Sequence, residues 1–190
     1  MVSLAQLLEE HGDLARAKKA YQQAAASGHS EMAPKAMRHL RDLLAEQDDV
    51  AGAKNAYQQV IASGDPDEAS LAALGLGALL GEHGDPVGAQ KAFEQAIALG
   101  DSGIAPVAMV SLGILLGEQG DLDGAKKAYE QAIASGEANM APMAMLRLGV
   151  LLTEHGDHAG ARKAFEQAAA SRHPSAAAMA REELAQLPRQ

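Results

Sequence analysis

The sequence predicts an all-α protein, an α-solenoid of about five stacked helix-turn-helix repeats with a capping helix at the C-terminal end. Residues recur every 36 positions along the 190-residue chain, which is the signature of a repeat architecture. All five aromatic residues fall in one phase of this period: Tyr21, Tyr57, Phe93, Tyr129 and Phe165. No segment alternates apolar and polar residues for long enough to predict a strand. Leucine shares the period, at Leu4, Leu40, Leu76, Leu112, Leu148 and Leu184.

Each copy of the repeat predicts two helices, and the fourth copy shows why. Residues 105–118 begin with Pro106 near the first turn and carry apolar residues at helical spacing. Asp121 follows a glycine and is placed to cap the second helix, residues 122–135, by accepting first-turn N–H groups. Gly136 is placed to end that helix. A two-helix unit cannot bury its apolar faces alone, so the copies are expected to stack.

The repeats run through the whole chain without a linker, so one elongated domain over residues 1–190 is expected. Its last segment carries charged residues at Arg181, Glu182 and Glu183, where inner copies are mostly apolar or neutral, which is typical of a solvating cap. The predicted repeats cover about residues 1–28, 29–64, 65–100, 101–136 and 137–172, and the capping helix covers residues 173–186.

Composition excludes several classes of protein. There are 16 basic against 25 acidic residues, so the net charge is −9 and the basic surface that nucleic-acid binding needs is missing. With no cysteine, the chain has neither a disulfide framework nor a thiolate metal site. The uncharged stretch from Ser102 to Gly117 is too short to span a bilayer, and the N-terminus lacks the basic region of a secretory signal. A cytoplasmic protein that contacts no membrane is expected.

The histidines do not form a convincing catalytic or metal site. His11, His83 and His155 share one repeat position, just before a Gly-Asp pair, and glutamine occupies it in the other copies. A position that accepts glutamine as readily as histidine predicts a turn residue. His155 and His158 have the spacing of a metal-ligand pair but lack a third ligand. No arrangement of catalytic side chains can be argued, so neither an enzyme nor a cofactor is expected.

Three glycines, Gly75, Gly77 and Gly81, resemble a nucleotide-binding loop. They follow no strand and fall inside the predicted first helix of copy three, so close helix packing is the better interpretation. In that helix Gly75 and Gly81 should each cost about 1 kcal/mol relative to alanine. The sequence therefore predicts that Gly75→Ala raises the thermal midpoint.

These residues resemble the tetratricopeptide repeat pattern, Trp-x2-Leu-Gly-x2-Tyr followed by Gly and Ala-x3-Phe/Tyr-x2-Ala. The period of 36 exceeds the family's usual 34, and the turn at residues 135–138 is similar to that of Sel1-like relatives. The resemblance covers essentially the whole chain and implies a right-handed solenoid that binds a peptide or protein. Copy four matches through Met109, Leu112, Gly113, Leu116, Gly120, Ala125, Tyr129 and Ala132, and copy five through Met145, Leu148, Gly149, Leu152, Gly156, Ala161, Phe165 and Ala168.

In the family that the chain resembles, the first helix of each repeat lines a concave binding face. Transferred position by position, this implies an apolar strip over copies three to five and a polar entry in copy two, which would set the orientation of a bound peptide or helix. The apolar positions are Leu71, Leu74, Ala78, Val107, Val110, Ile114, Met143, Leu146 and Val150, and the polar positions are Lys35, Arg38, His39 and Asp42.

Two alternatives to a foreign partner stay open. The same face, or an exposed end of the solenoid, could bind a second copy of the chain and form a homo-oligomer. The apolar positions could also be half-buried for structural reasons alone. A carboxylate clamp built from Lys35, Arg38 and Arg147 is disfavoured, because the asparagines that accompany such a clamp in the family are missing.

Overall fold

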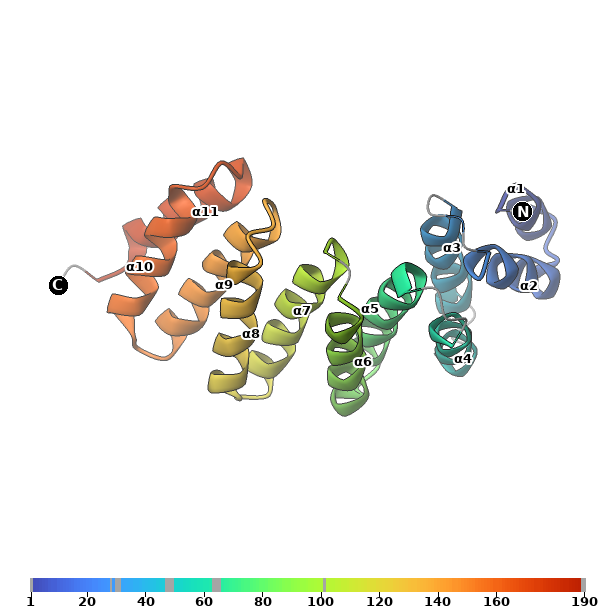
Figure 1. Cartoon of the computed structure of the whole chain (residues 1–190), viewed down its shortest axis with the longest axis horizontal. Helices are drawn as coiled ribbons and strands as arrows, with labels where there is room; N and C mark the ends of the chain where they lie inside the picture. The colour runs from blue at the N-terminus through green and yellow to red at the C-terminus, as the bar shows by residue number, and fades with distance from the viewer. Residues whose placement is uncertain are drawn as a thin grey trace. The chain divides into compact units, whose positions relative to one another are not determined.

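The computed structural model describes residues 2–27, 29, 32–46, 50–62, 66–100 and 102–188, of which Pro34, Arg38, Arg41, Asp42, Ala45 and Glu46 are described by their backbone only. This part of the chain forms eleven helices and contains no strand, which confirms the all-α solenoid (Figure 1). The helices are α1 Val2–Glu10, α2 Leu14–Ala25, α3 Met32–Glu46, α4 Val50–Ile61, α5 Pro66–Glu82, α6 Pro86–Leu99, α7 Ile104–Glu118, α8 Leu122–Ala134, α9 Met140–Glu154, α10 His158–Ala169 and α11 Pro174–Gln186. No helix among these residues is both long and apolar enough to cross a bilayer.

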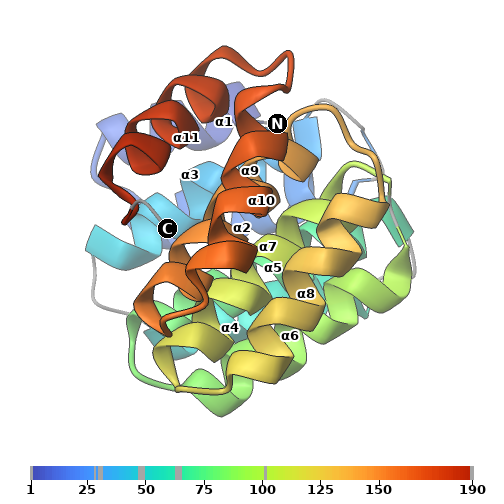
Figure 2. The same ribbon diagram turned by 90° about the vertical axis from the view of Figure 1, so that its left-hand side faces the viewer.

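The chain divides into two compact units, Met1–Ile104 and Ala105–Gln190. In the first unit, each of the helices α1 to α5 packs against the next one along the chain. In the second unit, α8 packs against α9, α9 against α10, and α11 against both α9 and α10. Figure 2 shows α10 and α11 side by side in a view turned by 90°. The expectation of a single domain with the five repeat ranges given above stays a prediction.

An aspartate caps the second helix of the repeat at each copy where that residue is described. The Asp121 carboxylate accepts the Gly124 N–H at 3.0 Å, which confirms the expected cap. The same bond recurs at 2.8 to 3.2 Å in three other copies. Gly136 follows the C-cap of α8 with φ 68°, the left-handed conformation that glycine adopts at low cost. The remaining capping aspartates are Asp13, Asp85 and Asp157.

The repeated histidines end the first helix of their repeats. The ring Nδ1 of His83 lies 2.8 Å from the Leu79 carbonyl oxygen, and His11 and His155 make the matching contact at 2.7 and 2.8 Å. Each ring thus places Nδ1 at hydrogen-bond distance from a carbonyl in the last turn of the helix, and the Leu7 and Leu79 carbonyls also accept the backbone N–H of the histidine. The prediction that these three histidines are turn residues agrees with this geometry. Within the described ranges, no group of three His, Asp or Glu side chains is arranged to hold a metal ion.

Glycines let the two helices of a repeat approach each other across the aromatic ring. A Cβ placed on Gly77 would lie 2.5 Å from the Phe93 ring, and one on Gly149 would lie 2.4 Å from the Phe165 ring. Such distances are too short for any real side chain, so the aromatic occupies the space that the missing Cβ leaves. Gly77 and Gly75 both lie within α5, as the close-packing interpretation predicts.

The surroundings of Gly75 indicate the opposite effect on stability from the one that helix propensity predicts. A Cβ on Gly75 would lie 2.6 Å from Cε1 of Tyr57, whose side chain is 5% exposed. Alanine there would push apart α4 and α5, which pack against each other. Gly81 is different, because its nearest neighbour would be the Ala89 Cβ at 3.8 Å, an ordinary contact. The expected gain from alanine therefore applies to Gly81.

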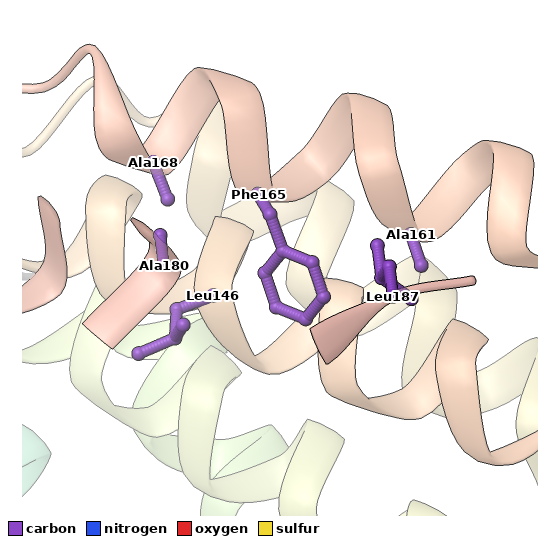
Figure 3. Packing of buried hydrophobic residues seen from close by; sticks show 6 residues of the cluster. All are labelled: Leu146, Ala161, Phe165, Ala168, Ala180 and Leu187. Carbon is purple, nitrogen blue, oxygen red and sulfur yellow. The ribbon is translucent and has the colours of Figure 1, made fainter. Parts of the chain in front are cut away.

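One core cluster of the second unit lies toward its C-terminal end. Phe165 on α10 is fully buried, and its ring lies between Leu146 on α9 and Leu187, which follows α11 (Figure 3). The small side chains Ala168 and Ala180 complete the contact between α10 and α11. The Arg162 guanidinium on α10 donates to the Pro188 carbonyl oxygen at 3.0 Å, which links α10 to the segment that follows α11.

Candidate partner-binding face

The predicted apolar strip of the second unit consists of half-buried side chains on α7 and α9. On α7, Val107, Val110 and Ile114 are all intermediate in exposure. Met143 on α9 is also half-buried, and the core residues of α7 lie elsewhere on the helix. These side chains retain contact area that is not used by the core. We name the six residues Val107, Val110, Ile114, Met143, Val150 and Met179 the apolar strip.

Leu146 does not belong to this strip, although its repeat position predicted it. Its side chain is 3% exposed and lies in the core cluster with Phe165 and Leu187. The reason is α11, which packs against α9 and covers this position. Val150 is intermediate, because it packs partly against the same cluster. The prediction that Leu146 is available to a partner is therefore wrong, because its side chain is buried.

Met179 on α11 is a strip residue that the sequence reasoning missed. Its side chain is 49% exposed, and it lies one period after Met143 and two periods after Val107. The helix was interpreted only as a charged cap, so its apolar residue in phase with Met143 was passed over. The 36-residue spacing itself would have identified Met179.

In the first unit the predicted positions lie on α3 and α5. Leu71 and Leu74 are half-buried and Ala78 is exposed, while Lys35 on α3 is exposed to solvent. These positions comprise apolar side chains on α5 and a positive charge on α3, and their role in binding stays a prediction. The side chains of Arg38 and Asp42 lie outside the described residues.

His39 is part of a polar contact between α1, α2 and α3. Its ring stacks on Tyr21 with the centroids 5.4 Å apart and 13° between the planes. The Tyr21 hydroxyl donates to Glu9 Oε2 at 2.6 Å, and the Gln6 side-chain nitrogen lies 3.4 Å from His39 Nε2. Burial, followed by the bond to Glu9, raises the pKa of Tyr21 well above its ordinary value. His39 therefore has a packing role, in addition to any role in binding.

Arg147 is the exposed cation on α9, one position after the buried Leu146. Its charge acts on Tyr129, whose pKa is raised to about 12 by burial, while Arg147 lowers it and Glu118 and Glu154 raise it. Arg147 is thus the positive charge that a partner on α9 would meet. The clamp with Lys35 that the sequence disfavoured would need residues from both units.

The two-helix repeats and the aromatic packed against a glycine define a helical-repeat protein. The chain belongs to the tetratricopeptide repeat family, whose model matches residues 2–53, 42–104 and 110–180. This assigns it to the class of protein–protein interaction scaffolds and confirms the resemblance seen in the sequence.

Solved structures with this fold resemble the chain at low sequence identity. BtubC (BKLC) from P. vanneervenii is 20% identical with a TM-score of 0.65, over 90% of this chain and 69% of that protein. MamA is 20% identical with a TM-score of 0.62, over 95% and 96% of the two chains. YrrB, described as a TPR protein with an unusual peptide-binding site, is 19% identical with a TM-score of 0.60, over 96% and 89%. A search of curated protein sequences gave no match.

Proposed function

We propose that the chain is a binding scaffold whose first helices hold a peptide or helix of another protein. The observation that carries this proposal is the apolar strip, in which successive helices α7, α9 and α11 place half-buried or exposed apolar side chains in phase. Apolar surface grouped in this way usually marks an interaction site. We propose no catalytic role, in keeping with the family, and the cytoplasmic location stays a prediction.

The partner is expected to contribute apolar side chains. An apolar strip with Arg147 beside it suits an amphipathic segment that carries a carboxylate at its edge. In the first unit, Lys35 and His39 would supply polar contacts next to Leu71 and Leu74. Because apolar contacts dominate the strip, the affinity should depend only mildly on salt.

A displayed library of random peptides, selected against the whole chain, tests this proposal. Selected peptides should bind the unmodified chain. The substitutions Val110→Asp and Met143→Asp should each weaken the binding of these peptides at least tenfold. Val87→Asp is the matched control, because Val87 is 63% exposed and lies on α6, outside the predicted face. Circular dichroism must show unchanged helicity in all three variants. Peptides that bind both strip variants as tightly as the control would contradict the strip assignment.

Self-association through the strip is the alternative function. Light scattering coupled to size exclusion, over a hundredfold range of chain concentration, distinguishes the two. A monomer throughout supports a foreign partner. A concentration-dependent dimer that Val110→Asp abolishes, and that Val87→Asp preserves, would support binding between copies.

A further inference from the structure

Tyr129 on α8 combines a buried ring with a hydroxyl that the fold does not use. The residue is 4% exposed, and its hydroxyl makes no hydrogen bond within the part of the chain that the structure describes. Unlike His158 Nδ1 and Ser171 Oγ, which are enclosed without a partner, the Tyr129 hydroxyl oxygen reaches the surface. The equivalent hydroxyl in copy one is already used, because Tyr21 donates to Glu9 at 2.6 Å. Tyr129 therefore keeps a donor for a ligand.

The repeat places Arg147 of α9 against this hydroxyl. At the same repeat position in copy three, a Cβ on Gly75 would lie 3.0 Å from the Tyr57 hydroxyl oxygen. His39 has the same relation to its neighbour, since it stacks on the tyrosine of copy one. The residue at this position thus meets the aromatic of the repeat before it. In copy five that residue is Arg147, and its charge acts on the Tyr129 hydroxyl.

Arg147 is a cation without a counter-ion in the fold. Its side chain is exposed and forms no ion pair with any carboxylate of the described residues. A guanidinium beside a free hydroxyl gives two kinds of donor with no acceptor. A carboxylate suits both, because it can accept from two donors at once and its charge offsets that of Arg147.

The position of Arg147 within the apolar strip indicates where this carboxylate comes from. Met143 precedes Arg147 by one turn of α9, and Val150 follows it by one turn. The strip also has members on α7 and α11, the first helices of the repeats before and after α9. A partner that covers the whole strip therefore has chain on both sides of the group that meets Arg147. The carboxylate is then that of a side chain and not that of a C-terminus.

The acidic residues nearby limit the charge of the partner. Glu118 and Glu154, the last residues of α7 and α9, are exposed and also act on the Tyr129 hydroxyl. They stand at the negative ends of two helix dipoles. A second carboxylate in the partner would be repelled there, so a single carboxylate between apolar residues fits better than an acidic run.

We propose that Tyr129 and Arg147 together select a partner segment that presents one glutamate or aspartate side chain between apolar residues. The hydroxyl and the guanidinium both donate to that carboxylate, while the neighbouring apolar side chains cover Met143 and Val150. This inference rests on the proposed function, because it concerns the same strip. It makes Tyr129 a specificity-determining residue in addition to a core residue.

Peptides selected from the displayed random library serve as probes, in pairs that differ only in an acidic residue and its amide. The selected sequences should share one acidic residue with apolar neighbours, although the net charge of −9 on the chain disfavours acidic peptides in general. Fluorescence anisotropy with the whole chain should show that the amide form binds about tenfold more weakly. High salt should reduce this ratio. Amidation of the peptide C-terminus should leave the affinity unchanged.

Variants of the chain locate the two donors. Arg147→Gln should bring the ratio between acid and amide forms close to one, and Tyr129→Phe should reduce it to about threefold, because one donor remains. Phenylalanine is compatible with this position of the repeat, since Phe93 and Phe165 occupy it in other copies. Lys127→Gln is the matched control, because it removes an exposed charge from the second helix α8. It should leave the ratio unchanged.

The outcomes separate this inference from the proposed function. A ratio that Arg147→Gln or Tyr129→Phe leaves unchanged overturns the inference alone. Selected peptides that Val110→Asp weakens, but that share no acidic residue or need a free C-terminus, also overturn it alone. Peptides that Val110→Asp does not weaken overturn the proposed function and the inference with it. A dimer of the unmodified chain that Arg147→Gln dissolves overturns the inference too, because a second copy then covers the strip.

Discussion

Two glycines of α5 should respond in opposite ways to the same substitution. Alanine is favoured over glycine inside a helix by about 1 kcal/mol, because glycine loses more backbone entropy on folding. At Gly81 the new methyl group would meet only Ala89 at 3.8 Å, so most of this gain should be realised. Gly81 is the second-last residue of α5, where fraying reduces the gain, and about 0.5–1 kcal/mol is expected.

At Gly75 the same methyl group must displace the Tyr57 ring. The distances to Cε1, Cζ and the hydroxyl oxygen would be 2.6, 2.9 and 3.0 Å. Overpacking of this kind costs about 1–3 kcal/mol, which exceeds the helix propensity gained. A net loss of about 1 kcal/mol is expected. The other copies carry Ser3, His39, Ser111 and Arg147 at this position, so glycine there is particular to copy three.

Thermal and urea unfolding of the full chain measure both variants, with circular dichroism as the readout. Gly81→Ala should raise the midpoint, and Gly75→Ala should lower it. The double variant should fall between the two single variants if the sites act independently. If Gly75→Ala raises the midpoint as much as Gly81→Ala does, helix propensity governs both sites and the contact with Tyr57 does not constrain α5.

Three further predictions concern hydrogen bonds and titration. Tyr21→Phe should lower the free energy of unfolding by about 1–2 kcal/mol in urea titrations, because Glu9 loses its donor; an unchanged stability would show that water replaces the hydroxyl. The raised pKa of Tyr129 favours the protonated hydroxyl in the folded state, so its contribution is complete below pH 10.0 and is lost as the pH rises toward 12. The unmodified chain should lose up to about 3 kcal/mol more than Tyr129→Phe over that interval, and parallel curves would refute this. Backbone N–H bonds from Met140, then Asn139, lower the pKa of Glu137 below its ordinary 4.5, so the chain should be more stable than Glu137→Gln at pH 7. That advantage should shrink as the pH falls through the lowered value, and a difference that does not depend on pH would contradict the capping role.

The period of 36 residues predicted much of the fold, because the same local chemistry recurs in each copy. The aspartate that caps the second helix and the glycine that ends it act through bonds to neighbouring residues, which a sequence displays directly. The helix boundaries predicted for the fourth copy therefore agree closely with those of α7 and α8. Glycine packing was also foreseen, because small residues at fixed positions indicate close helices.

The site could be predicted only in part, because burial depends on which helix lies alongside. Leu146 and Val110 occupy one repeat position, yet α11 covers Leu146 and leaves Val110 half-buried. Glycine is favoured at position 75 because the Tyr57 ring of another repeat lies close to it. The residue pattern within α5 gives no information about that distance. A periodic sequence identifies equivalent positions, whereas the environment of each position is set by its neighbours.

The same reasoning explains why residues at one repeat position differ in exposure from copy to copy. An apolar residue that is buried by a neighbouring helix in one copy is exposed in another copy if no helix covers it there. Leu4 and Leu7 repeat the pattern of the inner core, but they are exposed because no helix in the described part of the chain lies on them. Met179 follows the period onto the final helix, where it is 49% exposed. If this account holds, substitutions at these in-phase exposed residues should leave stability nearly unchanged, whereas the same substitutions at their buried equivalents should unfold the chain.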